Sequence, residues 1–402
     1  MNTIARTLST LTAAAALVLS AAPSLAADSP TIRLVERADG TLAVQKGGLY
    51  NGKAGSRVLA ETQEEIPTYT TPIKEVDTII ETDCAAIVSS ALSNDPDRMS
   101  QWGLSKLEIE SAWSHSKGEG VKVAVIDTGI DKNHPDFEGR VIRGYTAPGQ
   151  REGDYNGHGT HVAGIIGAGD NNQIAGSGVA PDVTIFEAKV TQDSGVGNSS
   201  WMAEGIVAAI NANVDIINIS MTANSPMPLV EAAINQAVAR NITVFAAAGN
   251  DGLKGSPTRW PAAYANTVAV ASITRDDKLS PFSNTNDYVD LTAPGSSIKS
   301  TVPNGAVGFM SGTSQATPHA AGAAALLKSY NHNMTNHEVR ETLISTTTGK
   351  LRTLNIMNAI ATQGFKKEPV QSIEQPVNTV NPLHQSAPKP INPVRHFSRP
   401  ER

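Results

Sequence analysis

Residues 311–322 read SGTSQATPHAAG and lead into an apolar, alanine-rich run that ends at Leu327. A run of this kind predicts a helix that is buried on all sides and begins near Ser314. The N-terminus of a helix carries a partial positive charge and N–H groups without a partner inside the helix. An oxyanion formed beside Ser314 is therefore stabilised, which is the setting that a nucleophilic serine needs.

Two upstream segments supply the partners of such a serine. Residues 121–129, VKVAVIDTG, form a nearly continuous apolar strand that ends in Asp127 and a glycine turn. A buried parallel strand delivers a charged residue to the edge of a sheet in this way. Residues 156–164, NGHGTHVAG, place His158 at the start of a helix rich in small residues. Asp127, His158 and Ser314 thus provide an orienting carboxylate, a general base and a nucleophile.

A fourth segment, residues 244–250, reads VFAAAGN and is another apolar strand. It ends in an amide side chain, that of Asn250. An amide N–H can stabilise the negative charge that develops on a carbonyl oxygen during acyl transfer. Asn250 is therefore a candidate oxyanion donor.

The four segments together resemble the motifs of the subtilisin-like serine proteases, the subtilases of peptidase family S8. The order Asp, His, Ser along the chain is that of this family, and the resemblance extends over residues 102–361. It implies that Asp127, His158 and Ser314 form the catalytic triad and that Asn250 contributes to the oxyanion hole. It also implies a serine endopeptidase that is made as a zymogen and hydrolyses peptide bonds through an acyl-enzyme on Ser314.

Alternative roles fit these residues less well. Singly, an Asp at a strand end is a common turn residue, and a Ser at a helix start is a common N-cap. His158 and His161 have a spacing that some metal sites use, but no glutamate lies between them and no third ligand is evident. Asp127-Thr-Gly and Asp193-Ser-Gly look like the turns of an aspartic protease. That interpretation leaves His158 and Ser314 unexplained.

Apolar strands alternate with helices along most of the chain. Strands are predicted at 121–126, 183–190, 214–220, 242–247 and 267–273, and helices at 158–167, 200–211, 229–240, 313–330 and 336–346. This alternation is typical of an α/β fold with a mostly parallel central sheet and helices on both faces. The resemblance implies the same subtilisin-like architecture.

Both ends of the chain differ in composition from this region. Residues 1–27 combine an early arginine, an apolar stretch and small residues, which predicts a secretory signal peptide. The protease domain is expected over residues 94–364. Residues 365–402 are rich in proline and poor in large apolar side chains, so they are expected to form a disordered tail.

Residues 28–93 lie between the signal peptide and the protease domain. They contain strand-like runs at 31–35 and 41–45 and a candidate helix within 78–92. By the resemblance, a segment in this position is a pro-domain that assists folding, blocks the cleft and is then removed. The pro-domain is thus an expected intramolecular inhibitor.

Composition limits the partners of the protein. The 32 basic and 38 acidic residues give a formal net charge of −6 and no basic patch, so nucleic-acid binding is not expected. No apolar run after the signal peptide is long enough for a membrane anchor. We expect a secreted, extracellular or periplasmic monomer that acts on protein or peptide substrates. The alternative is a catalytically silent secreted scaffold that only binds, and the intact triad argues against it.

The resemblance also implies a structural calcium site. Asp136 and the loop of residues 170–176 match the positions of a subtilase calcium site, and hard oxygen ligands suit Ca²⁺. The implied ligands are the side chains of Asp136 and Asn172, the carbonyls of Asp170, Ile174 and Gly176, and Asp95. The alternative is a polar loop with a helix-capping aspartate.

Three positions depart from the family pattern. Gln315 follows the nucleophile where many relatives have methionine, and an amide cannot form a sulfoxide. The edge of residues 220–223, Ser-Met-Thr-Ala, stands where relatives often have Ser-Leu-Gly-Gly. In the family this edge pairs with the substrate backbone like an added strand, and the implied pocket residues are Ser220, Met221, Thr222, Ala248 and Gly249.

The third departure is Arg259, which stands at what the resemblance makes the base of the primary specificity pocket. A guanidinium there favours an acidic residue before the scissile bond. The alternative is that Arg259 points into solvent and the pocket accepts large apolar side chains.

Overall fold

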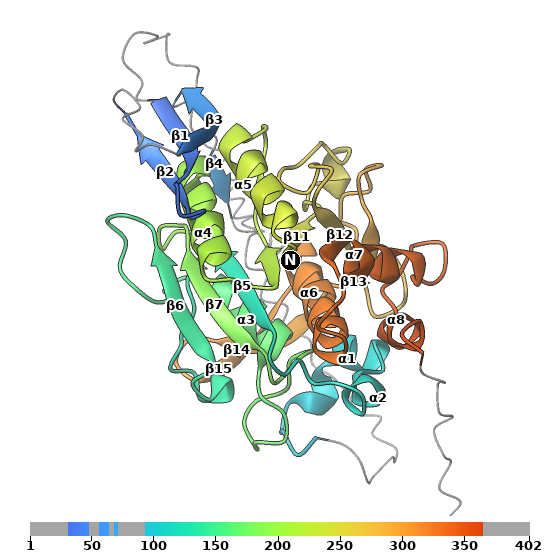
Figure 1. Cartoon of the computed structure of the whole chain (residues 1–402). Coiled ribbons are helices and arrows are strands. Elements are labelled where there is room, and N and C mark those ends of the chain that lie inside the picture. Colours follow the sequence, from blue (N-terminus) through green and yellow to red (C-terminus); the bar gives the residue numbers. More distant parts are fainter. Residues whose placement is uncertain (1–30, 48–55, 64–67, 71–92, 365–402) are drawn as a thin grey trace, which may run out of the picture. The chain divides into compact units, whose positions relative to one another are not determined.

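The computed structural model describes residues 31–47, 56–63, 68–70 and 93–364, all of them within one compact unit. Within these residues, seven parallel strands form the central sheet in the order β13-β12-β11-β9-β5-β7-β6 (Figure 1). The strands are β5 (Lys122–Asp127), β6 (Val141–Thr146), β7 (Thr184–Lys189), β9 (Ile216–Ile219), β11 (Thr243–Ala247), β12 (Val268–Ile273) and β13 (Leu291–Pro294). The predicted parallel sheet is confirmed.

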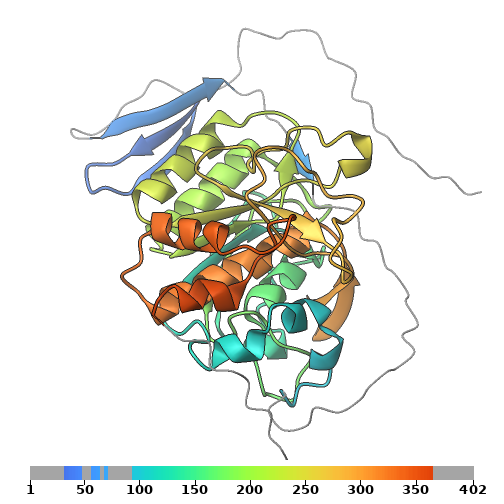
Figure 2. The ribbon, with the colours of Figure 1, turned by 90° about the vertical axis from the view of Figure 1, so that its right-hand side faces the viewer.

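Helices cover both faces of this sheet (Figures 1 and 2). One face packs against α4 (Ser199–Asn211) and α5 (Pro228–Ala239), the other against α3 (His158–Gly167) and α6 (Thr313–Tyr330). In β5, Val123 belongs to the core with α3 and α6, and its neighbour Ala124 to the core with α4 and α5. Strands buried on both faces read as continuous apolar runs, which is why the sequence located five of the seven, β5, β7, β9, β11 and β12. β6 and β13 were not predicted.

The carboxyl ends of three neighbouring strands bring the candidate site together. β5 ends at Asp127, β9 is followed by Ser220, and β11 is followed by residues 248–250. Parallel strands end at one edge of a sheet, and ligands of open α/β sheets bind outside that edge. The first residues of α3 and α6, His158 and Thr313, meet these strand ends, as the contacts of the site below establish.

Smaller elements surround the central sheet. β14 (Ile298–Val302) and β15 (Ala306–Met310) form an antiparallel hairpin. β8 (Val196–Asn198), β4 (Thr68–Thr70) and β10 (Thr222–Ala223) form an antiparallel three-stranded sheet with β4 in the middle. The remaining helices are α1 (Trp102–Lys106), α2 (Ile109–Trp113), α7 (Asn336–Ser345) and α8 (Ile356–Ala361), with short 3-10 turns η1 (Arg98–Ser100), η2 (Pro135–Phe137) and η3 (Gly252–Lys254).

A separate antiparallel sheet precedes the central α/β region along the chain and packs on α4 and α5. It consists of β1 (Thr31–Glu36), β2 (Leu42–Lys46) and β3 (Arg57–Gln63). Its apolar side chains Ile32, Leu34 and Leu42 share one core cluster with the two helices. The Asn211 side chain accepts the Leu42 N–H at 3.1 Å and donates to the Leu42 carbonyl at 3.0 Å. Arg240 pairs with Glu36 at 3.0 Å.

Several sequence predictions lie outside the described residues. These are the signal peptide at 1–27, the candidate helix within 78–92 and the tail from residue 365. The strand-like runs at 31–35 and 41–45 correspond to β1 and β2. None of the helices in the described part of the chain is both long and apolar enough to cross a bilayer.

Candidate active site

Asp127 and His158 form a buried pair. The His158 Nδ1 atom lies 2.8 Å from Asp127 Oδ1, and the two side chains are 4% and 0% exposed, respectively. Asp127 Oδ1 also accepts the Thr128 N–H at 2.7 Å, so the carboxylate is held by its own strand end. With Nδ1 donating to the carboxylate, His158 Nε2 is left as a proton acceptor. This Nε2 atom is buried and has no hydrogen-bond partner within the described residues.

Ser314 stands at the second position of α6 and exchanges two hydrogen bonds with Ser220. Its Oγ donates to the Ser220 carbonyl at 2.8 Å, and the Ser220 Oγ donates to the Ser314 carbonyl at 2.8 Å. The Ser314 carbonyl is available because Pro318, one helical turn later, has no N–H to donate to it. Within the described residues no hydrogen bond joins Ser314 Oγ to His158. Such catalytic hydrogen bonds often form only when substrate is bound.

Asn250 lies beside the start of α6. Its Oδ1 atom accepts the Thr313 N–H at 2.8 Å and the Thr313 hydroxyl at 2.9 Å. Because Oδ1 is held in this way, the Nδ2 donor of Asn250 is directed away from Thr313. The neighbouring Ser314 N–H belongs to the first helical turn, whose N–H groups have no intrahelical acceptor. Asn250 Nδ2 and Ser314 N–H are therefore two donors on one side of the nucleophile.

The other histidine of the HxxH motif is a neutral hydrogen-bond donor. Burial lowers the pKa of His161 to about 3, with a further contribution from the nearby His158. Its Nε2 atom lies 2.9 Å from the Ile298 carbonyl and 3.1 Å from the Gly308 carbonyl. His161 thus links α3 to the β14–β15 hairpin, and its Nε2 atom is occupied by hydrogen bonds to these two carbonyl groups. No group of three or more potential His, Cys, Asp or Glu metal ligands occurs among the residues that the structure describes.

Asp193, considered above as half of an aspartic dyad, has other partners. Its carboxylate pairs with Lys189 at 2.9 Å and with Arg151 at 2.6 Å. These cations lower the pKa of Asp193 against the opposing effect of burial. Asp127 pairs instead with His158, so the two aspartates do not share a proton.

The edge of residues 220–223 is paired with the chain's own N-terminal segment. In the register of β4, Thr70 lies opposite Thr222 and Val196, and Tyr69 lies opposite Ala223 and Gly197. This is the added-strand arrangement expected for a substrate backbone. Met221, predicted to line the pocket, is fully buried and packs into the core with α4 and α5.

Arg259 is neither exposed nor unpaired. Its side chain is 13% exposed, and its Nε and Nη2 atoms lie 2.9 and 2.8 Å from Asp251 Oδ2. A Cβ atom placed on Gly249 would lie 2.7 Å from Arg259 Cγ, so the stem of the arginine packs directly on this glycine. The next residue, Trp260, bonds the backbone of Ala223 in both directions at 2.7 and 3.2 Å. Arg259 therefore lies among the predicted pocket residues with its charge paired.

Three of the predicted calcium ligands, Asp95, Asn172 and Asp136, are joined by hydrogen bonds. Asp95 accepts the N–H groups of Asn172 and Gln173 at 2.9 Å through Oδ1, and that of Asn171 at 2.9 Å through Oδ2. Asp136 Oδ1 accepts the Asn172 amide at 2.9 Å, and its Oδ2 atom is buried with no hydrogen-bond partner in the described residues. Burial, together with the charge of Asp95, raises the pKa of Asp136 to about 7.

This arrangement fits a hard cation. The acidic side chains of Asp95 and Asp136 are held close together. The buried Asp136 Oδ2 atom has no hydrogen-bond donor among the described residues, and coordination to a cation would compensate its charge. The Asp170 carboxylate pairs with Lys117 at 2.9 Å. The carbonyl of Asp170 therefore stays the predicted ligand. The carbonyls of Ile174 and Gly176 belong to the same loop.

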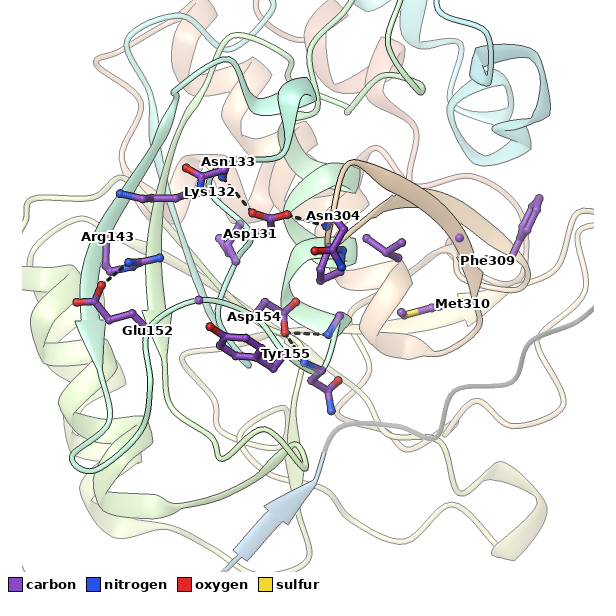
Figure 3. Close-up of a pocket in the computed structure, with 17 residues that line it drawn as sticks. Asp131, Lys132, Asn133, Arg143, Glu152, Asp154, Tyr155, Asn304, Phe309 and Met310 are labelled. Atoms are coloured by element: carbon purple, nitrogen blue, oxygen red, sulfur yellow. Dashed lines mark hydrogen bonds and ion pairs between the residues drawn. The ribbon is translucent and has the colours of Figure 1, made fainter.

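A cavity of about 790 Å³ opens beside the loop that carries His158 (Figure 3). It is lined by the turn after β5, residues 152–157 and the β14–β15 hairpin, and Figure 3 places Asp154, Tyr155 and Met310 around it. Asp154 was not singled out by the sequence, nor was Asp251, the partner of Arg259. The available signal for Asp154 is its place in a polar loop just before a helix, where carboxylates commonly cap N–H groups.

Comparisons with known proteins agree with this geometry. Residues 118–369 match the model of the subtilase family. The intracellular serine protease of Paenibacillus polymyxa is 42% identical over 260 residues, which are 61% of this chain and 79% of that protein. The subtilisin of Bacillus pumilus is 42% identical over 254 residues, 61% of this chain and 91% of that protein. The chain spans 66% of the length of subtilisin E from Bacillus subtilis (strain 168), at the same identity.

Solved structures give the same result. A cold-adapted subtilisin-like serine proteinase is 35% identical, with a TM-score of 0.54 over 60% of this chain and 88% of that chain. A protease from Pseudoalteromonas arctica is 28% identical, with a TM-score of 0.62 over 68% of this chain and 99% of that chain. The chain therefore belongs to the subtilase family of serine endopeptidases.

Proposed function

We propose that this protein is an exported subtilisin-like endopeptidase, made as a zymogen, that cleaves peptide bonds through an acyl-enzyme on Ser314. The observation that carries the proposal is the 2.8 Å Asp127–His158 hydrogen bond at the edge of the sheet where α6 presents Ser314. The signal-peptide composition of residues 1–27 supports export.

The reaction begins when the Ser314 hydroxyl leaves the Ser220 carbonyl and attacks the substrate carbonyl carbon. His158 Nε2 takes the hydroxyl proton as the C–O bond forms, and Asp127 stabilises the resulting imidazolium through Nδ1. Asn250 Nδ2 and the Ser314 N–H donate to the oxyanion. The imidazolium then protonates the leaving amine as the C–N bond breaks. Water, deprotonated by His158 Nε2, then attacks the acyl carbon. The ester bond to Ser314 breaks, the imidazolium returns its proton to Ser314 Oγ, and the acid product leaves.

The substrate backbone pairs with the edge that β4 now covers. β4 lies between β8 and β10, and Thr222 of this edge is two residues from Ser220, whose carbonyl holds Ser314 Oγ. A strand in this position excludes another peptide, so we assign β4 the role of intramolecular inhibitor. The sheet β1–β3 anchors the inhibitor on α4 and α5. The cavity on the other side of the His158 loop accommodates the residues after the scissile bond.

Calcium is assigned a structural role away from the reaction. Asp95, Asp136 and the Asn172 side chain would hold it, together with the carbonyls of Asp170, Ile174 and Gly176. A bound ion would supply positive charge that offsets the repulsion between these carboxylates. These residues would then hold the loop of residues 170–176 against the segment that contains Asp95.

Labelling with a fluorophosphonate, followed by mass analysis, tests the proposed function. The reagent reacts with an activated serine, so we expect one adduct on Ser314 in protein that has lost its N-terminal segment. The Ser314→Ala variant, purified in the same way, is the control and acquires no adduct. Shortened, folded protein without an adduct contradicts the endopeptidase assignment and supports the binding scaffold.

Activity is expected to persist in dilute hydrogen peroxide because Gln315 offers no thioether next to Ser314. Met310 lies close by, with its Sδ atom 4.0 Å from Gln315 Nε2, but it is only 7% exposed. The matched Gln315→Met variant is expected to lose most of its activity in the same peroxide solution. The remaining activity is measured over time with a peptide nitroanilide. Equal loss in both proteins means that another residue is the sensitive one.

The primary pocket is expected to prefer small side chains, because Arg259 packs on Gly249 and its ion pair with Asp251 would have to be desolvated by a large apolar group. Peptide nitroanilides that differ only in Ala, Phe or Glu before the scissile bond measure this preference as kcat/KM. The Arg259→Gly variant should raise the value for Phe about tenfold. Asp251→Asn, which unpairs Arg259, should raise the value for Glu by a similar factor. A wild-type preference for Phe over Ala would show that Arg259 does not fill the pocket.

Removal of calcium is expected to lower the melting temperature by roughly 5–10 °C. This follows if the ion is present at about 100 times its Kd, which contributes about 2.7 kcal/mol. Scanning calorimetry with excess Ca²⁺ or excess chelator measures the difference. Asp136→Asn is the matched variant, and its melting temperature should no longer depend on calcium. A wild-type melting temperature that is the same in both buffers rules out the site.

A further inference from the structure

We infer that Asp154 is a positioning residue that fixes the distance between Asp127 and His158. This carboxylate is 6% exposed and, among the described residues, accepts five hydrogen bonds. Oδ1 accepts the Thr128 hydroxyl at 3.0 Å and the N–H groups of Asn156 and Gly157 at 2.9 and 2.8 Å. Oδ2 accepts the Thr160 N–H at 3.0 Å and its hydroxyl at 2.7 Å.

The five donors belong to the two segments that carry the catalytic pair. Thr128 follows Asp127 directly, whereas Gly157 and Thr160 flank His158. The Thr128 hydroxyl also accepts the Gly159 N–H at 2.9 Å, so it bridges the two segments a second time. A shift of one segment against the other would break these bonds together. The 2.8 Å distance between Asp127 and His158 is thus set by a carboxylate outside the triad.

Close packing also limits how near the segment of Asp127 and the segment of His158 can come to each other. A Cβ atom placed on Gly159 would lie 2.1 Å from the Gly129 carbonyl oxygen and 3.1 Å from Asp127 Cβ. The two segments are therefore in backbone contact and cannot approach further. Asp154 prevents them from separating. Steric contact thus keeps Asp127 and His158 from moving closer, and the hydrogen bonds of Asp154 keep them from moving apart.

The charge of Asp154 also acts on α3 itself. His158 is the first residue of this helix, where the helix dipole disfavours the positive charge that the imidazole acquires in the reaction. Asp154 places a negative charge on the N–H groups of the same turn, including that of Thr160. The negative charge of Asp154 thus offsets the positive end of the helix dipole at His158, whose ring must become an imidazolium. Figure 3 shows the Asp154 carboxylate turned toward the backbone that leads into α3.

The test compares Asp154→Asn with a matched control, Asp215→Asn. Asp215 directly precedes β9, at the end of the strand opposite to Ser220, and its carboxylate also accepts a backbone N–H group, that of Lys122 at 2.9 Å. We expect kcat of Asp154→Asn to fall about 100-fold, with KM within about threefold of the wild-type value, because a small displacement of reacting groups costs about this much. Asp215→Asn is expected to keep kcat within about threefold of the wild-type value.

Three further measurements separate positioning from a loss of fold. Each variant is matured in trans by a trace of tagged wild-type enzyme, which is then removed, and Ser314→Ala treated identically gives the background. The affinity for a peptide boronate, which forms a tetrahedral adduct with the serine, should fall in parallel with kcat in Asp154→Asn. Thr128→Val removes the hydroxyl that bonds Asp154 and the Gly159 N–H, but it leaves the other four bonds of Asp154 in place, so it should have a smaller effect. Its effect should not be additive with Asp154→Asn, since the two residues act as one unit.

The inference rests on the proposed function, and the outcomes distinguish the two. A wild-type protein without activity or fluorophosphonate adduct contradicts the proposed function. An active wild type whose Asp154→Asn variant keeps kcat within threefold overturns the positioning role of Asp154 alone. If Asp154→Asn does not fold, the Thr128→Val variant tests the positioning role in its place. A folded Thr128→Val variant with wild-type kcat and boronate affinity also overturns that role.

Discussion

The Ser314→Ala variant is expected to lose kcat by on the order of 10⁶-fold, the loss that subtilisin shows when its nucleophile is removed. The substitution deletes one buried hydroxyl at the start of α6 and leaves the apolar residues of that helix in place. The Ser220 carbonyl loses one donor, which costs about 1 kcal/mol, so the fold should persist. Peptide hydrolysis by mature enzyme and unfolding in denaturant measure the two effects.

The same variant should accumulate as an uncut precursor, because under the proposed function the enzyme itself makes the cut that removes β4 from its edge. Mass analysis of the purified protein reads the N-terminus directly. Wild-type enzyme added in trans is the control, since it should shorten the variant without restoring activity. A Ser314→Ala protein that matures alone would show that another protease performs the cut.

Replacement of Asp127 by asparagine is expected to lower kcat about 10⁴-fold with little change in fold. Asparagine has the same size, and its oxygen can still accept the Thr128 N–H that Asp127 accepts at 2.7 Å. Its NH₂ group, however, faces His158 Nδ1 as a donor. The ring then carries its proton on Nε2, where it can no longer accept the proton of Ser314.

The tautomer can be observed independently of the rate. Nitrogen NMR of the imidazole distinguishes a proton on Nδ1 from one on Nε2, and we expect the change between wild type and Asp127→Asn. Asp127→Glu is a useful comparison, because it retains the charge but lengthens the side chain. A folded Asp127→Asn variant with kcat within tenfold of wild type would falsify the role of Asp127 as the orienting carboxylate.

The sequence located most of the elements that are buried on both sides, but it missed β13, whose four residues are all buried. The helices predicted at 158–167 and 313–330 begin and end at the observed residues, because glycine and apolar runs mark their limits. β6 was not predicted, since its outer residue Ile142 is 48% exposed and the strand mixes charged and small residues. A strand at the border of a sheet lacks the continuous apolar signal of its neighbours.

The site was predicted in part for a similar reason. Asp127, His158 and Asn250 stand at the ends of predicted elements, so their meeting follows from the topology of a parallel sheet. The Arg259–Asp251 pair and the five bonds of Asp154 depend on side-chain directions within loops. β4 was missed because a strand of three residues acquires its identity only from β8 and β10, which lie far along the chain.

Pro318 affects the hydrogen bonding of the Ser314 nucleophile before substrate binds. Because Pro318 has no N–H group, the Ser314 carbonyl has no donor within the helix and accepts the Ser220 hydroxyl instead. Ser314 Oγ in turn donates to the Ser220 carbonyl, so the two serines are joined by reciprocal hydrogen bonds. Freeing the nucleophile breaks one bond, worth about 0.5–1.5 kcal/mol, or about two- to thirteenfold in rate. The described part of β4 pairs only with Thr222 and Ala223 of this edge, and the bond from Ser314 to Ser220 is present beside it. A substrate strand that extends one step further and donates an N–H group to the Ser220 carbonyl is expected to displace the Ser314 hydroxyl from this acceptor. The hydroxyl would then be released by a bound substrate and not by water.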